Sequence, residues 1–451
     1  MRLSLPAPRK QPVRFAALCL GGFVLMQLVF FALLVAGAAV PDKPIVDQLA
    51  KDVKAKTYGP ASIKDRMGGS SDAFTECVVV GTGLGGPQDT SVFHKAGTMP
   101  RLSNCKLGAG QIVALSEGKD ANENSFYYRY WAGYTPLTRP ALALFGMTGM
   151  RIIAGGLLFL SLYAAGRSLS KQVGGLAAVG LLGPLVLATN LSSTPSTSFS
   201  QSISISAYLF GTALCAWAAS RSVALGLAAV SAAAGIFCYV DLLTTPAVGW
   251  ALSAATVAGV TWARTQRLGT TFWTLLAAGV IWPVSFAVTW VSRWIFAIPF
   301  AGWDAVLKDV KTSIFFRTGG EYRGVEDRLW APTSKNWNYW LDHITTARGV
   351  LWVGLAVAAV ALVLAFRRGL SNGLAALLLA LPALTVPFWY EALRNHSQLH
   401  SFFVYRGVPV ALGVIVFATL VAARRPRVVE RPATVSGPRV RAAETEAVAA
   451  H

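Results

Sequence analysis

Three carboxylates border apolar segments of the chain. Asp72 and Glu76, in SSDAFTECVVV, lie four residues apart, so on a helix they would share one face. Asp241, in FCYVDLLTTP, separates two long apolar runs. A carboxylate at the edge of an apolar region can take a proton from a substrate hydroxyl, so all three are candidate catalytic bases. Two structural roles stay open as well: a helix N-cap for Asp72 and an Asx turn for Asp241.

A band of cationic and aromatic residues follows in SFYYRYWAGYTPLTRPALALF. Arg129, Tyr130 and Trp131 form the amphipathic pattern of a membrane–water interface. Arg139 lies in TPLTRPALALF, which is too short to span a bilayer and is expected to form an interfacial or re-entrant helix. Arginine forks bind phosphate, so these residues are candidate contacts for a lipid phosphate. An aromatic belt with snorkelling arginines is the structural alternative.

A second cationic group lies near the end of the apolar sequence, in RNHSQLHSFFVYRG. His396 and His400 are four residues apart, and Tyr405 and Arg406 lie within the first turn or two of the last apolar run. Together they predict a donor-rich rim that suits a phosphate, although an ordinary interfacial rim would have the same composition. The two histidines lack an H-E-x-x-H pattern, and no other histidine or cysteine cluster has ligand spacing. We therefore expect no metal site.

The composition is that of a membrane protein. Of 451 residues, 54% are hydrophobic and 14% are charged, whereas soluble domains carry about 25% charged residues. Each long apolar run approaches or exceeds the roughly 17–20 residues that a membrane-spanning helix needs. The runs are 15–40, 149–166, 173–189, 200–219, 223–240, 244–263, 270–291, 349–366, 371–390 and 402–423. They predict an all-α polytopic membrane protein with about ten transmembrane helices.

Charge placement predicts the topology. Arginine and lysine precede the first span and recur in every second connection, which assigns those connections and both termini to the cytoplasm. Three of the 21 acidic residues lie in the C-terminal tail, and all the others fall on the outward segments. The net charge of +19 is spread over the inner loops and the tail. A nucleic-acid partner is therefore not expected.

The apolar runs and the charge placement together divide the chain into seven parts. A cytoplasmic N-terminus (1–14) and the first transmembrane helix (15–40) precede a large extracytoplasmic loop with an interfacial helix (41–148). A transmembrane bundle (149–291), a second extracytoplasmic loop (292–348), more transmembrane helices (349–423) and a disordered cytoplasmic tail (424–451) follow. The high Ala, Arg and Gly content suggests a GC-rich bacterium, so the expected location is a bacterial plasma membrane, with multiple passes and an extracytoplasmic active site.

Two cysteines lie in the first outward loop. Cys77 and Cys105 are the only cysteines outside the apolar runs. Thiols outside the cytoplasm oxidise, so we expect a disulfide that closes a loop of about 28 residues. Two free thiols are the alternative.

The order of these segments resembles the GT-C superfamily of membrane glycosyltransferases, which use polyprenyl-phosphate sugars. More locally, DAFTE, YRYWAGYTPLTRP, YVDLLTTP and NHSQLHSFFVYR are similar to signatures of a bacterial polytopic family associated with that superfamily. The resemblance implies transfer of a sugar from a polyprenyl-phosphate donor to an extracytoplasmic glycan or glycoconjugate. It also implies a catalytic carboxylate in the first outer loop, where Asp72 and Glu76 match, although the usual adjacent acidic pair is absent.

The residues fit such a reaction without a cofactor. One carboxylate would accept the proton of the acceptor hydroxyl, and cations would stabilise the departing phosphate, so no divalent metal is required. Similarity in layout to cell-wall arabinosyltransferases favours a pentofuranose or hexose donor. A multi-span transporter or lipid flippase with Asp241 as its coupling site is the alternative. The large insert favours the enzyme, because transport does not require it.

Overall fold

The computed structural model describes residues 12–86, 90–121, 125–319 and 322–425. Most of the two terminal segments expected to be cytoplasmic, 1–14 and 424–451, lies outside these ranges. The described chain is helical apart from two short antiparallel ladders, β1 (Ser62–Lys64) with β2 (Ser70–Asp72), and β3 (Pro100–Arg101) with β4 (Ser125–Phe126). The all-α class expected from the sequence is confirmed at this level.

Eight segments of the described chain are helices long and apolar enough to cross a membrane. They are Ala16–Ala38 within α1 (Pro12–Ala38), α6 (Thr135–Val173), α9 (Phe199–Ala219), α10 (Val223–Val240), α12 (Leu268–Ala301), α15 (Ala347–Arg367), Leu370–Ala392 and Ser401–Ala422. Leu370–Ala392 comprises α16 (Leu370–Ala380), η2 (Leu381–Leu384) and α17 (Thr385–Ala392), and Ser401–Ala422 comprises α19 (Ser401–Val404) and α20 (Gly407–Ala422). Counting one bent pair of helical segments as a span gives nine. The pair consists of α7 (Gly175–Leu187) and of η1 (Leu191–Ser193) with α8 (Thr194–Thr197), and its two parts are bent by 66° relative to each other.

The remaining apolar run forms α11 (Pro246–Thr265), which does not belong to those nine. This helix is rich in Ala, Gly, Ser and Thr, and its residues from Pro246 to Trp262 are all buried. It packs against α9, α10, α12 and α20. Small residues allow helices to approach closely within a bundle, so α11 is a central helix with little surface of its own.

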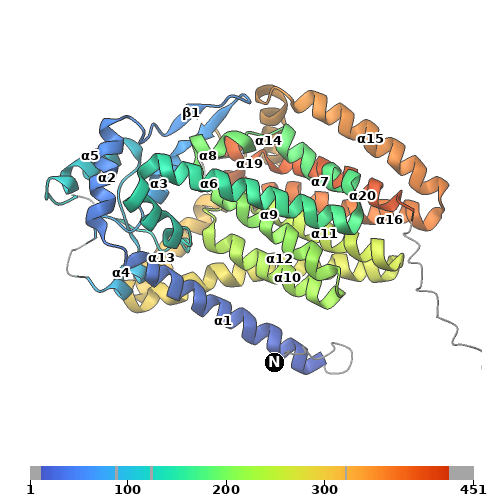
Figure 1. Cartoon of the computed structure of the whole chain (residues 1–451), viewed down its shortest axis with the longest axis horizontal. Helices are drawn as coiled ribbons and strands as arrows, with labels where there is room; N and C mark the ends of the chain where they lie inside the picture. Colours follow the sequence, from blue (N-terminus) through green and yellow to red (C-terminus); the bar gives the residue numbers. More distant parts are fainter. Residues whose placement is uncertain (1–11, 87–89, 122–124, 320–321, 426–451) are drawn as a thin grey trace, which may run out of the picture.

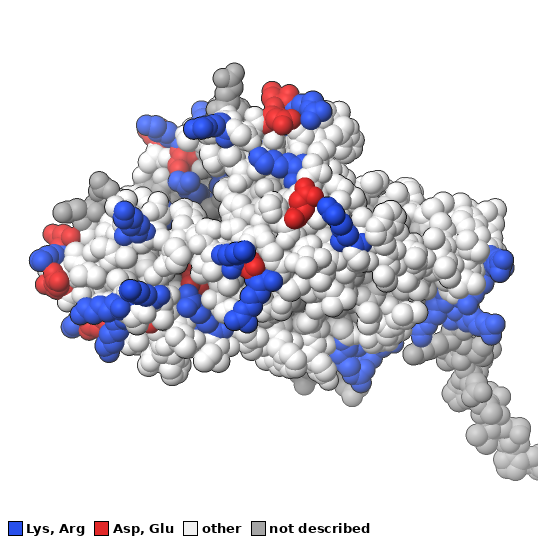
Figure 2. Space-filling view, turned by 90° about the horizontal axis from the view of Figure 1, so that it is seen from above, with Lys and Arg blue, Asp and Glu red and all other residues white. Residues whose placement is uncertain are grey.

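The long helices run side by side, and helices of the first insert gather at the left end of the bundle (Figure 1). We call this the insert end, and the opposite end the basic end. Figure 2 shows lysine, arginine and acidic side chains mixed over the insert end. Among the described atoms in that view, the basic end shows lysine and arginine without acidic side chains. A weakly charged flank between two charged ends is what a membrane-spanning bundle requires.

The first insert is a compact helical unit. It contains α2 (Asp42–Lys54), α3 (Ala73–Gly81), α4 (Val92–Thr98) and α5 (Cys105–Ser116). Cys77 on α3 and Cys105 at the start of α5 form a disulfide, with their Cα atoms 5.2 Å apart. The disulfide joins α3 to α5, which the β3–β4 ladder does not do.

The insert meets the bundle at a break in α6. Gly146 has φ 61° and ψ −164°, and a Cβ there would lie 2.7 Å from Asp52 Oδ2 on α2. The same oxygen accepts a hydrogen bond of 3.0 Å from the backbone N–H of Met147, so Asp52 caps the second part of α6. The first part, from Thr135 to the break, is a short helix over the segment for which the sequence predicts one.

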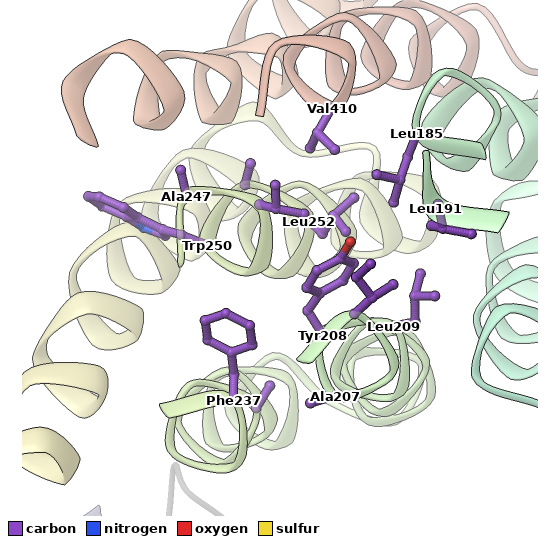
Figure 3. Packing of buried hydrophobic residues seen from close by; sticks show 14 of the residues in the cluster. Leu185, Leu191, Ala207, Tyr208, Leu209, Phe237, Ala247, Trp250, Leu252 and Val410 are labelled. Atoms are coloured by element: carbon purple, nitrogen blue, oxygen red, sulfur yellow. The ribbon is translucent and has the colours of Figure 1, made fainter. Parts of the chain in front are cut away.

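Shorter helices complete the insert end. They are α13 (Trp303–Thr318) and α14 (Ala331–His343) in the second insert, and α18 (Arg394–Leu399) before α19. Within the bundle, Figure 3 shows the core, where side chains of α7, η1, α9, α10, α11 and α20 meet. Leu209, Phe237, Leu252 and Val410 are among these buried residues. Tyr208 projects from α9 into the same space and brings a hydroxyl into an apolar core.

Candidate active site

Asp72 lies at the junction of β2 and α3 and is buried. Its Oδ1 accepts a hydrogen bond of 3.2 Å from the backbone N–H of Thr75, so it is the N-cap of α3. Its Oδ2 accepts a bond of 2.9 Å from the side-chain amide of Gln201, on α9. Burial raises the pKa of Asp72, and its hydrogen bonds and the charge of Arg406 only partly oppose this rise. A carboxylate with a raised pKa is a stronger base than an exposed one.

Arg406 lies just before α20 and is fully buried. Its Nε and Nη2 donate hydrogen bonds of 3.0 and 2.8 Å to the side-chain oxygen of Asn190. The hydroxyl of Tyr405 donates to the same oxygen at 3.1 Å. Arg406 Nη1 has no hydrogen-bond partner within the described chain. The guanidinium is thus held on one edge, and its remaining nitrogen is buried without a partner in the described chain.

Asn190 connects Arg406 to the first insert. It lies at the bend between α7 and η1, and its Nδ2 donates to Asp65 Oδ2 at 3.3 Å. Asp65 also accepts hydrogen bonds from Ser71, from Ser193 at 2.6 Å and from the backbone N–H of Met67 at 2.8 Å. The bent span exists because this polar junction interrupts an apolar helix, and the bend places the junction beside Arg406.

Three buried polar atoms of this region have no partner among the described residues: Arg406 Nη1, Gln201 Oε1 and the Tyr208 hydroxyl. Asn190, which binds Arg406, also donates to the hydroxyl of Ser71 at 3.4 Å, next to Asp72, and Gln201 binds Asp72 itself. Buried polar atoms in native proteins are normally satisfied by protein, water or ligand. The cluster therefore has donor and acceptor capacity for a polar molecule.

Glu76 has a different environment from that of Asp72. Its Oε1 accepts a bond of 2.5 Å from Arg151 Nη2, on α6, and its Oε2 accepts one of 2.9 Å from the backbone N–H of Phe199. Glu76 is therefore half of an ion pair and also binds the N-terminus of α9, where a negative charge is favourable. Asp72 takes the N-cap role that the sequence left open, and Glu76 lies in the first turn of the same helix. Both oxygens of Glu76 are occupied by the fold.

Asp241 holds the turn that follows it, which is a structural role as the sequence allowed, although the bond reaches the residue three positions on and not two as in an Asx turn. Its Oδ2 accepts a bond of 2.8 Å from the backbone N–H of Thr244, and its Oδ1 accepts one of 2.5 Å from the Thr244 hydroxyl. Ser204 on α9 also hydrogen-bonds this carboxylate. Burial raises the pKa of Asp241 to about 6. Within this turn Leu243 has φ 64°, an uncommon conformation for a side chain of its size.

His396 and His400 are packed into the fold. The Nε2–H of His396 donates to the carbonyl oxygen of Leu243 over 2.7 Å, and the two imidazole rings lie 4.7 Å apart. Burial, and then the charge of Arg317, lower the pKa of His400 to about 4, and burial lowers the pKa of His396 well below its ordinary value. Both rings are neutral at pH 7. This corrects the prediction of a cationic histidine rim.

The predicted aromatic and arginine band separates into individual contacts. Arg129 pairs with Asp309 on α13 at 3.3 Å, and the Trp131 indole donates to the carbonyl oxygen of Thr289 at 2.6 Å. Tyr130 accepts a bond of 2.5 Å from Arg317.

All three guanidinium nitrogens of Arg139 donate hydrogen bonds within the protein. Arg139 donates to the carbonyl oxygens of Gly37, Gly83 and Val40 and forms an ion pair with Asp42. Its guanidinium therefore ties α1 to the insert, and the expected phosphate contact is corrected to a structural one. Of the predicted cations, Arg406 alone combines full burial with a position beside a candidate base.

Sequence reasoning missed Asp65, Asn190, Gln201 and Arg317. Asn190 and Gln201 lie in ATNLSSTPSTSFSQSIS, a polar stretch inside an otherwise apolar region, and that contrast was a usable signal. Within the described chain, no three histidine, cysteine or acidic residues are grouped as a metal site requires.

No protein-family model, curated protein or solved structure matches this chain. The function is therefore argued from the geometry of the site.

Proposed function

We propose that this chain is a GT-C-like membrane glycosyltransferase that transfers a sugar from a polyprenyl-phosphate donor to a cell-envelope glycan or glycoconjugate. The observation that supports this most is the buried pair of Asp72 and Arg406. A carboxylate with a raised pKa lies near a guanidinium that has a buried nitrogen without a partner in the described chain. General-base transfer to a hydroxyl with a phosphate leaving group needs these two groups.

In the proposed reaction, the acceptor hydroxyl oxygen forms a bond to the anomeric carbon of the sugar. The bond from that carbon to the phosphate oxygen breaks, and polyprenyl phosphate leaves as an anion. Asp72 accepts the hydroxyl proton, while Arg406 Nη1 donates a hydrogen bond to the departing phosphate. Gln201 and Asn190 orient the two charged groups through the contacts described above.

The same proposal assigns secondary roles to the other predicted residues. Glu76 holds α3 to α6 through Arg151 and to α9 through the N–H of Phe199, beside the base. Asp241 shapes the turn that supports His396. The insert end would face the outside of a bacterial plasma membrane, which agrees with the excess of basic side chains at the opposite end.

A lipid flippase or transporter is the second candidate, and the bend of 66° at Asn190 favours it. Discontinuous helices with polar groups at the break are common at transport sites. In that case Asn190 and Arg406 would bind the head group during passage, and Asp241 would be the site of proton coupling.

Nanodiscs and proteoliposomes distinguish the two functions. Nanodiscs carrying the protein receive radiolabelled polyprenyl-phosphate arabinose or hexose with a delipidated envelope fraction as acceptor, and labelled glycan is measured. Proteoliposomes are assayed for movement of the same labelled lipid.

Asp72→Asn should reduce sugar transfer by about two to four orders of magnitude, the usual cost of losing a base. The variant should fold, because asparagine also caps helices and the Gln201 amide can turn to present its unpartnered oxygen. Asp47→Asn removes a carboxylate from an exposed pair with Lys43 and should leave transfer unchanged. Normal transfer by Asp72→Asn would contradict the enzyme proposal, and lipid movement that depends on Asp241 without any transfer would support the transporter.

A further inference from the structure

An apolar stripe runs along the exposed side of α13. Trp303, Leu307 and Ile314 are 62%, 37% and 47% exposed. Their spacings of four and seven residues place them on one side of the helix. Exposed large apolar residues aligned on one helix face mark a contact with lipid or protein.

One side of α13 is fixed against the protein, so the stripe cannot turn inward. Val306, Ser313 and Arg317 are buried on the side adjacent to the stripe. Arg317 donates hydrogen bonds to the hydroxyl of Tyr130 and the carbonyl oxygen of Ser313, both at 2.5 Å. Its guanidinium also lies 5.9 Å from the ring centre of Trp290, on α12.

The position of α13 points to the bilayer as the partner. Only Gly302, with φ 85°, separates α13 from α12, one of the candidate spans. The stripe therefore begins where a membrane-spanning surface ends. α4 packs beside the end of α12, where the His94 ring lies 6.0 Å from that of Phe300, and Phe93 on α4 is 58% exposed.

The charges on α13 suit lipid head groups. Lys308 and Lys311 are exposed; Lys311 lies next to the stripe, and Lys308 lies further round the same exposed side, beyond Phe315. A helix with an apolar stripe flanked by lysine is the pattern of a helix that lies in the membrane interface. By contrast, the exposed face of α14 carries Ser334, Lys335 and Asn338 together with one tryptophan.

We propose that α13 lies in the interfacial zone of the bilayer, with Trp303, Leu307 and Ile314 among the lipid chains and Lys308 and Lys311 at the phosphates. The helix then fixes the depth of the insert end relative to the membrane. This placement is independent of whether the protein transfers sugar or moves lipid.

Site-directed spin labelling tests the placement. In a Cys19→Ser background, which keeps the disulfide and leaves two buried thiols, nitroxides are attached to Leu307→Cys or Ile314→Cys in nanodiscs containing anionic lipid. Ala305→Cys and Thr312→Cys are matched controls, because both positions are exposed on the opposite side of the helix.

Labels on the stripe should be accessible to oxygen and protected from a water-soluble nickel complex, and the controls should show the reverse. Equal nickel access on both sides would contradict the proposal. Spin–spin broadening at Leu307 that disappears on dilution with unlabelled protein would assign the stripe to a second copy and would also overturn it.

Discussion

Asp72 and Glu76 lie four residues apart on the same segment, and each has an arginine nearby, yet the two pairs are built differently. Glu76 binds Arg151 directly at 2.5 Å, and its other oxygen binds a helix N-terminus. Asp72 has no direct bond to Arg406 among the described contacts. A neutral amide holds each of these two residues: Gln201 for Asp72 and Asn190 for Arg406.

The difference separates a structural pair from a candidate catalytic one. A direct ion pair neutralises its own charges and leaves nothing for a substrate. Charges that are held by neutral side chains keep their capacity to act on a third molecule, at the cost of burial without direct compensation. Natural proteins accept this unfavourable free energy of burial at functional sites.

The largest expected effect on stability comes from breaking the direct pair. Glu76→Ala leaves Arg151 without its partner and the N-terminus of α9 without its carboxylate. Removing one partner of a buried pair typically costs about 3–5 kcal/mol, and partial exposure of Arg151 favours the lower end. Denaturant unfolding in detergent measures the change.

Glu117→Ala is the matched control, because Glu117 pairs with Lys119 on the surface and its loss should cost little. Transfer per folded molecule should survive Glu76→Ala. If that variant is as stable as the wild type but inactive, then Glu76 is the base, and the structural and catalytic roles assigned to the two carboxylates are exchanged.

The disulfide gives the next largest effect. Cys77 directly follows Glu76, so the bond and the ion pair hold the same turn of α3. Replacing both cysteines with serine should lower the free energy of unfolding by about 2–4 kcal/mol. Mass shifts on alkylation, with and without reduction, verify the bond, and two thiols that alkylate freely in native membranes would contradict it.

Arg406→Ala tests the indirect pair. The loss of a charge-assisted hydrogen bond should weaken binding of polyprenyl phosphate by about 1.5–3 kcal/mol. Titration of the lipid into nanodiscs measures it. Arg348→Ala removes an exposed arginine near the insert end and should bind normally. Unchanged binding by Arg406→Ala would remove Arg406 from the site.

Much of the helical layout follows from the sequence because a bilayer permits few alternatives. All the long apolar runs are helical here, including α11. Local roles were also accessible, since the cap at Asp72 and the turn at Asp241 involve residues within three positions. The partner of Glu76 lies 75 residues away, and Asn190 and Arg406 lie 216 apart. Such contacts depend on how helices pack, which residue type and spacing alone do not specify.

The smallest expected effect is a dependence on pH that separates stability from activity. Burial raises the pKa of Asp72, so the folded protein holds this proton more tightly than the unfolded chain. The contribution of Asp72 to stability therefore increases as the pH falls through the window between its raised pKa and the ordinary value of 3.8. Through this group, the free energy of unfolding changes by at most about 1.4 kcal/mol per pH unit.

Because asparagine does not titrate, the stability difference between the wild type and Asp72→Asn isolates this group. Acidification should shift that difference in favour of the wild type, while the transfer rate of the wild type falls because a protonated Asp72 cannot act as a base.

Glu76→Gln is the comparison variant. Burial also raises the pKa of Glu76, so its stability difference should move in the same direction. Its transfer profile should nevertheless follow that of the wild type, since Glu76 takes no proton from the acceptor. A transfer profile that changes in Glu76→Gln would show that the two carboxylates act together in the reaction.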